Sequence, residues 1–357
     1  MSYLHNLSVK LKRGEDINIS FLGGSVTEGY GATNSAEKGW PTLICQKMEQ
    51  EYGVRVNANN RGIGGTCSYL ANFRYGADVE PYSPDVLFIE FAVNDKYDSV
   101  PYERVVRHSE SLIGKAYRQN PYMDIVYVLT FDLGDKTDDY IQLVAHRDMA
   151  MRYDLLAIKM SEHMYPLCNA TGEDIQEHYM DGVHPNDHGY ATYADIIFKA
   201  LKDNIHTDTV GDELVKHSFL HSGRELLLNA GFVYGDEADI HNNSGWEFEK
   251  NIFSYLGGCY HGRLKSDKPG SSFELRFTGT DIGLLFGADV NRGIASISVD
   301  GGESMIIDAH RPQINVKEIA VAEHLPYGEH SVVITLLEEK NENSNSNFFE
   351  IGVFLVS

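Results

Sequence analysis

Ser25 lies in a glycine-rich stretch, SFLGGSVTEGYG (residues 20–31), directly after a short apolar run. A serine there can belong to a phosphate-binding loop, to an ordinary turn between a strand and a helix, or to a nucleophilic site at a strand end. A nucleophilic serine needs a base to take its proton, a group that orients the base, and donors for the oxyanion. The choice therefore depends on whether such partners occur elsewhere in the chain.

The spacing of the glycines argues against a nucleotide site. The first glycine cluster is followed by Tyr30, where a Walker A loop requires lysine. The second cluster, GIGGTCS (62–68), has Cys67 where the dinucleotide motif requires glycine. The nucleophile elbow G-x-S-x-G also fails, because Thr27 replaces its last glycine.

A base and an orienting carboxylate stand three residues apart in YMDGVHPNDHGY (179–190). Asp181 and His184 lie on a loop that contains glycine and proline, just before a helical pattern over 187–202. Such a carboxylate can hold one ring nitrogen while the other faces a serine. The same spacing fits a capping aspartate and a surface histidine in a chain with 15 histidines, so both interpretations stay open at this point.

Hydrogen-bond donors follow two further strands. NANNRGIGGTCS (57–68) places Asn60 and Gly65 in a turn, and FIEFAVNDK (88–96) places Asn94 directly after an apolar strand. An amide side chain and a backbone N–H at neighbouring strand ends make a suitable oxyanion site. Each residue taken alone is equally typical of a turn.

The elements that must position these residues alternate between strand and helix over the first 200 residues or so. This alternation predicts an α/β fold, a parallel sheet with helices on both faces in three α/β/α layers. Ligands of such folds bind beyond the carboxyl ends of the strands, which is where Ser25 lies. We expect strands over 17–24, 54–60, 85–91 and 124–131, and helices over 40–53, 101–120, 138–163 and 187–202.

The pattern changes after about residue 205. The polar segment DNIHTDTVGDE (203–213) indicates a domain boundary, giving a first domain over 1–208 and a second over 209–357. The second has short alternating runs separated by Gly, Asp and Asn, which predict an antiparallel β-sandwich. Residues 338–347 are polar and of low complexity, so we expect a loop between its last two strands.

Four motifs in this order resemble those of the SGNH (GDSL-type) hydrolase superfamily. A serine follows the first strand, a glycine the second and an asparagine the third, and Asp-x-x-His precedes the last helix. The resemblance covers roughly residues 15–205. The matching blocks are 23–25, 60–65, 92–95 and 181–184.

The resemblance implies a role for each residue. Ser25 would be the nucleophile, His184 the general base and Asp181 the group that orients it. The backbone N–H groups of Ser25 and Gly65 and the side chain of Asn94 would form the oxyanion hole. Two positions depart from the family pattern. Gly24 replaces the aspartate before the serine and Ala92 replaces the glycine of G-x-N-D, both beside functional positions.

The domain order, with the sandwich second, resembles the two-domain mannan O-acetylesterases of gut bacteria. The resemblance implies a cytoplasmic serine esterase that removes acetyl groups, 2-O-acetyl included, from mannan-derived oligosaccharides through an acyl-enzyme. The alternatives are an acetylxylan or other acetyl-sugar esterase, a short-chain lipase or thioesterase, and a noncatalytic sugar-binding protein. The absence of a long apolar loop argues against an acyl-chain tunnel.

Aromatic side chains near the motifs could stack on sugar rings. Trp40, Tyr69 and Tyr30 lie near the catalytic blocks, and Trp246 lies in the polar stretch NNSGWEFEKN (242–251). We take Trp40 and Trp246 as candidate substrate contacts, with core packing as the alternative for each.

Charge and composition exclude several classes of partner. With 30 basic and 52 acidic residues the formal charge is −22, which disfavours nucleic acid and anionic membranes. No run approaches the roughly 18 apolar residues of a membrane span, and no leader pattern opens the sequence. The four cysteines lack metal-ligand spacing, as expected of thiols in a reducing cytoplasm. We assign no metal or cofactor and leave the oligomeric state open.

Overall fold

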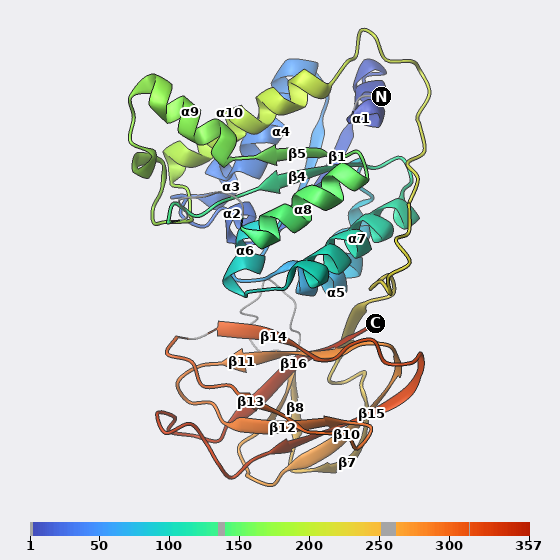
Figure 1. Cartoon of the computed structure of the whole chain (residues 1–357), viewed down its shortest axis with the longest axis vertical. Helices are drawn as coiled ribbons and strands as arrows, with labels where there is room; N and C mark the ends of the chain where they lie inside the picture. The colour runs from blue at the N-terminus through green and yellow to red at the C-terminus, as the bar shows by residue number, and fades with distance from the viewer. Residues whose placement is uncertain (1–2, 135–139, 251–261, 314) are drawn as a thin grey trace. The chain divides into compact units, whose positions relative to one another are not determined.

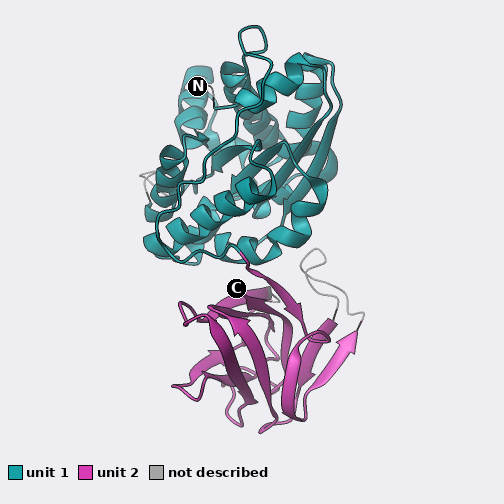
Figure 2. Ribbon diagram, turned by 90° about the vertical axis from the view of Figure 1, so that its right-hand side faces the viewer, with its two compact units in different colours: residues 1–228 teal, residues 229–357 magenta. Residues whose placement is uncertain are grey.

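A computed structural model describes residues 3–134, 140–250, 262–313 and 315–357. The chain divides into two compact units, the first ending at Leu228 and the second beginning at Asn229 (Figure 2).

The first unit is built on a five-stranded parallel sheet of order β2-β1-β3-β4-β5. The chain order reverses direction at β1, which pairs with both β2 and β3. A reversal of this kind marks the edge of the sheet where α/β proteins bind ligands. The strands are β1 (Ile17–Gly23), β2 (Val56–Gly62), β3 (Val86–Glu90), β4 (Asp124–Leu129) and β5 (Leu156–Lys159).

Helices cover both faces of this sheet (Figure 1). Alternate residues of a strand enter different cores: Phe88 of β3 packs with α1, α4 and α10, whereas Leu87 and Ile89 pack with α5, α7 and α8. The predicted three-layer α/β/α fold is therefore confirmed. The helices are α1 (His5–Lys12), α2 (Ser25–Glu28), α3 (Ser35–Lys38), α4 (Trp40–Tyr52), α5 (Ser68–Asp78), η1 (Glu80–Tyr82), α6 (Ala92–Tyr97), α7 (Tyr102–Gln119), α8 (Ile141–Arg152), α9 (Ser161–Thr171), η2 (Ile175–His178) and α10 (Asp187–Asn204).

The single helix predicted over 138–163 is wrong. Helix α8 ends at Arg152, Asp154 takes a left-handed conformation with φ 52°, and the edge strand β5 follows before α9 begins. The strand has only four residues and buries every second one. An apolar run this short cannot be told from a helical segment by its periodicity.

The boundary between the units falls after Leu228 instead of after residue 208. Residues 209–228 contain no helix or strand, yet they pack along the first unit (Figure 1). His217 Nε2 lies 2.9 Å from Asp124 Oδ1, and the Ser222 hydroxyl donates to Glu110 Oε2 at 2.6 Å. Both carboxylates are fully buried, so this polar segment belongs to the first unit rather than to a solvated linker.

The second unit consists of two antiparallel sheets that enclose one apolar core, which confirms the predicted β-sandwich. One sheet has the order β13-β12-β15-β10-β7, and the other β14-β11-β16-β9-β8, with β6 also paired to β16. The polar segment 338–347 connects β15 to β16, as expected. The strands are β6 (Gly231–Tyr234), β7 (Asp239–Ser244), β8 (Glu247–Lys250), β9 (Gly262–Ser266), β10 (Ser272–Gly279), β11 (Ile282–Ala288), β12 (Ile294–Val299), β13 (Met305–Asp308), β14 (Asn315–Ala322), β15 (Gly328–Leu336) and β16 (Phe349–Val356).

Within the described part of the chain, each helix is too short or too polar to cross a bilayer. Cys45, Cys67 and Cys168 are buried, and Cys259 lies outside the described residues.

Candidate active site

Ser25 opens the short helix α2, two residues beyond the carboxyl end of β1. The backbone N–H of Glu28 donates to the Gly24 carbonyl at 3.0 Å, and Gly29, with φ 93°, ends the helix one turn later. This tight strand-to-helix turn holds the serine at the sheet edge, with 9% of its surface exposed.

The structure brings Ser25, His184 and Asp181 together. Ser25 Oγ lies 2.8 Å from His184 Nε2, and His184 Nδ1 lies 2.7 Å from Asp181 Oδ2. With Nδ1–H donated to the carboxylate, Nε2 carries the lone pair that accepts the serine hydroxyl. The imidazole is thus oriented to take a proton from Ser25.

The loop 179–186, which joins η2 to α10, supports this geometry. Asp181 Oδ1 accepts the backbone N–H groups of Val183 and His184, each at 2.8 Å, and the Met180 N–H donates to the His184 carbonyl at 2.8 Å. Partial burial acts to raise the pKa of Asp181, but the hydrogen bonds from His184 and Val183 outweigh it and hold the pKa below its usual value. The carboxylate therefore stays ionised beside the imidazole.

The glycine-rich turn after β2 packs against α2. A Cβ added at Gly62 would lie 2.1 Å from the Glu28 backbone nitrogen, and one at Gly64 would lie 3.5 Å from the Ser25 Cβ. Gly65 has φ 72°, a left-handed conformation that favours glycine. The structure thus places the predicted donor Gly65 in the turn that contacts the Ser25 helix.

Asn94 lies in the first turn of α6, beyond the end of β3. Its amide packs so closely on Gly24 that a Cβ there would lie 2.2 Å from Asn94 Oδ1. In this chain, any larger residue at position 24 would require the Asn94 side chain to move.

Glu28 is a residue that the sequence analysis missed. Its Oε2 accepts the Gly64 N–H at 2.8 Å, which ties the glycine-rich turn to the helix of the nucleophile. Burial raises the pKa of Glu28 although the Gly64 N–H and the charge of His184 act to lower it. No local sequence pattern reveals this role, because the Gly64 N–H that Glu28 accepts comes from the turn after β2.

The two tryptophans do not offer a surface to a sugar. Trp40 is 0% exposed, packs edge-on against Phe21 and Phe88, and donates its indole N–H to the Val26 carbonyl at 3.0 Å. Trp246 is 4% exposed and packs on aromatic rings of the sandwich core. Both are core residues because their ring faces are covered by other side chains, which corrects the expectation of substrate contacts.

Tyr30 is the aromatic residue of these motifs that faces solvent. It is 56% exposed, and its ring meets that of His184 edge-on with the centroids 4.8 Å apart. Tyr69, in contrast, is buried. An aromatic ring beside the base is a suitable wall for a sugar.

Glu90 ends β3 beneath Ser25 and is fully buried. Thr27 Oγ1 donates to its Oε2 at 2.9 Å and Thr130 Oγ1 to its Oε1 at 2.6 Å. Burial nevertheless raises the pKa of Glu90 from 4.5 to about 7, because these hydrogen bonds offset only part of the cost of desolvation.

This shift predicts a pH-dependent stability. Between pH 4.5 and about 7 the unfolded chain loses the Glu90 proton while the folded protein keeps it, so rising pH favours unfolding. Relative to Glu90→Gln, the wild-type free energy of unfolding should fall by about 3 kcal/mol across that range and change no further above it. Urea denaturation of both proteins from pH 4.5 to 8 checks this. Parallel stability curves would contradict it.

A serine, a histidine and an aspartate at the carboxyl edge of a doubly wound parallel sheet form the constellation that serine hydrolases use. Residues 21–192 match the model of the GDSL-like Lipase/Acylhydrolase family.

Solved structures extend the likeness to both units. The fold is similar to that of a two-domain esterase (CEX) active on acetylated mannans, with a TM-score of 0.85 and 24% identity over 99% of this chain and 95% of that chain. A crystal structure of a two-domain esterase (CEX) co-crystallized with mannopentaose gives a TM-score of 0.84 at 24% identity, over 99% and 94% of the chains. This likeness establishes the two-domain fold.

An acetylxylan esterase from Xylanibacter ruminicola is also similar in sequence, with 24% identity over 226 residues. The match covers 55% of this chain and 45% of the length of that relative.

Proposed function

We propose that the protein is a serine esterase that removes O-acetyl groups, 2-O-acetyl included, from mannan-derived oligosaccharides. The observation that carries this proposal is the hydrogen-bonded series from Ser25 Oγ through His184 to Asp181, with distances of 2.8 and 2.7 Å. The model that matches residues 21–192 is that of a lipase and acylhydrolase family, and cleavage of an acyl ester is the reaction that this series suits.

In the first half of the reaction, Ser25 Oγ attacks the carbonyl carbon of the acetyl ester while His184 Nε2 takes the hydroxyl proton. The negative charge that develops on the carbonyl oxygen is stabilised by the N–H groups of Ser25 and Gly65 and by the Asn94 amide. His184 then returns the proton to the sugar oxygen as its bond to carbon breaks. The products are the free sugar hydroxyl and an acetyl-Ser25 ester.

In the second half, His184 takes a proton from water, and the hydroxide attacks the acetyl carbonyl through the same oxyanion site. The bond to Ser25 Oγ breaks, the serine regains its proton from His184, and the acetic acid that leaves loses its remaining proton to water to give acetate. Asp181 stays ionised throughout and stabilises the imidazolium that forms in each half.

The choice of sugar is supported by three features. The two-domain fold is similar to that of an esterase active on acetylated mannans, and an exposed aromatic ring, Tyr30, stands beside His184. A neutral sugar also suits a chain of charge −22, which repels anionic partners. Acetylated xylan is the second candidate, because the similar curated protein is an acetylxylan esterase.

The test compares acetate release from acetylated glucomannan and acetylated xylan oligosaccharides, with Ser25→Ala as the control. Selective release from the mannan substrate that disappears in Ser25→Ala is the expected result, and NMR of the remaining acetyl groups reads out the 2-O position. Equal release from both substrates would keep the esterase and discard the mannan preference. Hydrolysis of an octanoyl ester without acetate release from either would reject the sugar substrate.

A further inference from the structure

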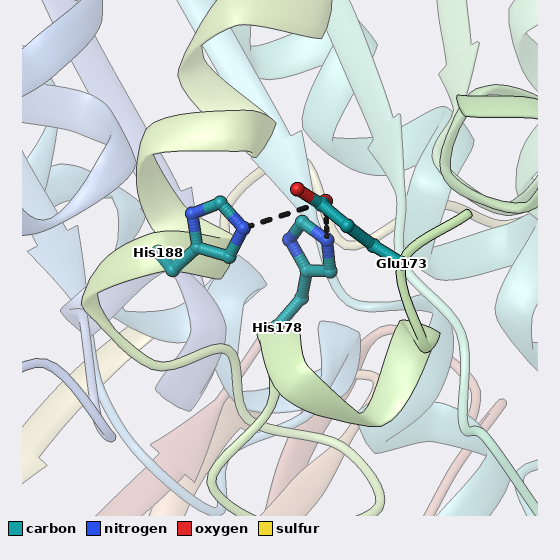
Figure 3. Close-up of side chains that lie close together, drawn as sticks. All are labelled: Glu173, His178 and His188. Carbon is teal, nitrogen blue, oxygen red and sulfur yellow. Dashed lines mark hydrogen bonds and ion pairs between the residues drawn. The ribbon is translucent and has the colours of Figure 1, made fainter. Parts of the chain in front are cut away.

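A second cluster of titratable side chains lies at the base of the loop that carries Asp181 and His184. Glu173 precedes η2, His178 is the last residue of η2, and His188 lies in the first turn of α10. One carboxylate oxygen and one nitrogen of each ring all lie within 4.8 Å of one another. Figure 3 shows a nitrogen of each imidazole ring directed at the Glu173 carboxylate.

Thr192 determines which nitrogen of His178 carries the proton. The Thr192 hydroxyl donates to the His188 backbone carbonyl at 3.0 Å, so its oxygen is left to accept from His178 Nδ1 at 3.2 Å. A neutral His178 then presents the bare lone pair of Nε2 to Glu173 Oε2, which lies 3.1 Å away. Two lone pairs facing each other at this distance repel. The His178 side chain is 1% exposed, so water cannot separate the two atoms. The contact therefore requires either a proton on one of them or a cation that both of them bind.

The distances suit a metal ion shared by the three residues. Glu173 Oε2 lies 3.1 Å from His178 Nε2 and 3.6 Å from His188 Nε2. Ligand atoms about 2.1 Å from a tetrahedral zinc ion lie roughly 3.4 Å from one another. The rings are stacked, with centroids 4.1 Å apart and planes inclined by 23°, so the exposed His188 ring must turn for both Nε2 lone pairs to point at one ion. Two imidazoles and one carboxylate favour zinc and neighbouring transition metals over calcium or magnesium, which prefer oxygen ligands alone.

We propose that Glu173, His178 and His188 bind one divalent transition-metal ion, zinc being the best match, with Thr192 orienting His178. The half-exposed His188 and Glu173 leave an approach from solvent and room for water as a further ligand. Because His178 and His188 stand on either side of the loop 179–186, the ion would join the two ends of that loop. The Asn186 N–H already donates to the His178 carbonyl at 3.0 Å across the same gap.

The test is titration of the full-length protein, freed of metal with a chelator, with Zn²⁺ in a calorimeter and in thermal unfolding. We expect one zinc per chain at this cluster and a rise in Tm that the chelator reverses. Thr192→Val, which keeps the shape but removes the hydroxyl, should weaken zinc binding about 10- to 100-fold. His188→Ala and Glu173→Gln remove ligands and should weaken it at least as much.

His241→Ala supplies the matched control, because His241 Nε2 lies 2.8 Å from Asp239 Oδ1 in an exposed pair on the second unit. It should bind zinc as the wild type does. Absence of zinc binding and of a Tm shift in the wild type would overturn the proposal, as would undiminished affinity in both His188→Ala and Glu173→Gln. If His188→Ala fails to fold, the zinc affinities of Glu173→Gln and Thr192→Val, compared with that of the wild type, test the proposal instead. None of these readouts depends on esterase activity.

Discussion

Replacement of Ser25 by alanine is expected to lower kcat for acetyl-ester hydrolysis on the order of 10⁶-fold while the fold is kept. Without the hydroxyl, His184 Nε2 has no nucleophile to activate, and the acetyl-enzyme cannot form. The removed group is small and lies at the sheet edge, so Tm should change little. Initial rates on an acetyl ester and a thermal unfolding curve measure the two effects.

The chain offers a matched control in a second serine–histidine pair. Ser68 Oγ lies 3.0 Å from His108 Nδ1, but both residues are buried, so no ester can reach them. Burial and the nearby arginines hold the pKa of His108 well below its usual value. A fluorophosphonate should therefore label the wild type and Ser68→Ala equally and leave Ser25→Ala unlabelled. Turnover or labelling that survives in Ser25→Ala would reject Ser25 as the nucleophile.

Replacement of Asn94 by alanine is expected to lower kcat by about 10²- to 10³-fold, or ~3–4 kcal/mol, with KM nearly unchanged. The Asn94 amide packs against Gly24, immediately before the nucleophile, and so can donate to an oxygen that Ser25 has just attacked. The charge on that oxygen appears only as the tetrahedral intermediate forms, so the loss should fall on turnover rather than on substrate binding. Steady-state kinetics on a soluble acetyl ester separate the two constants.

Asn57→Ala serves as the control for this substitution. Asn57 is an exposed amide at the amino end of β2, on the opposite edge of the sheet, and it bonds Asn18 at 2.9 Å. Its loss should leave kcat unchanged. A large rise in KM with normal kcat in Asn94→Ala would assign Asn94 to ground-state binding and remove it from the oxyanion site.

The sequence predicts the parts of the site that rest on local patterns. Ser25 after an apolar strand and the spacing of Asp181 and His184 are visible in the chain, and the family resemblance joins them. Asn94 and Gly65 are found because each follows a strand. In a parallel sheet the carboxyl ends of neighbouring strands share one edge, so these residues converge.

The roles of residues that depend on burial cannot be predicted from the sequence. The residues next to Glu90 in the sequence do not indicate that its carboxyl group is fully buried. Thr130, which donates to this carboxyl group, follows a different strand, β4. Trp40 and Trp246 fail as sugar contacts for the same reason, since an aromatic residue beside a motif can point inward or outward. The strand β5 is missed because four residues, of which every second one is buried, are too few to define a period.

The segment 209–228 has a practical consequence for anyone dissecting this protein. It supplies His217 to Asp124 and Ser222 to Glu110, two carboxylates that are otherwise sealed inside the fold. A fragment cut near residue 208 would lose these partners and leave Asp124 with the Leu7 N–H and Glu110 with the Tyr153 hydroxyl. A buried carboxylate that loses hydrogen bonds destabilises the fold. An excised hydrolase fragment should therefore extend to Leu228, where the fold itself ends its first compact unit.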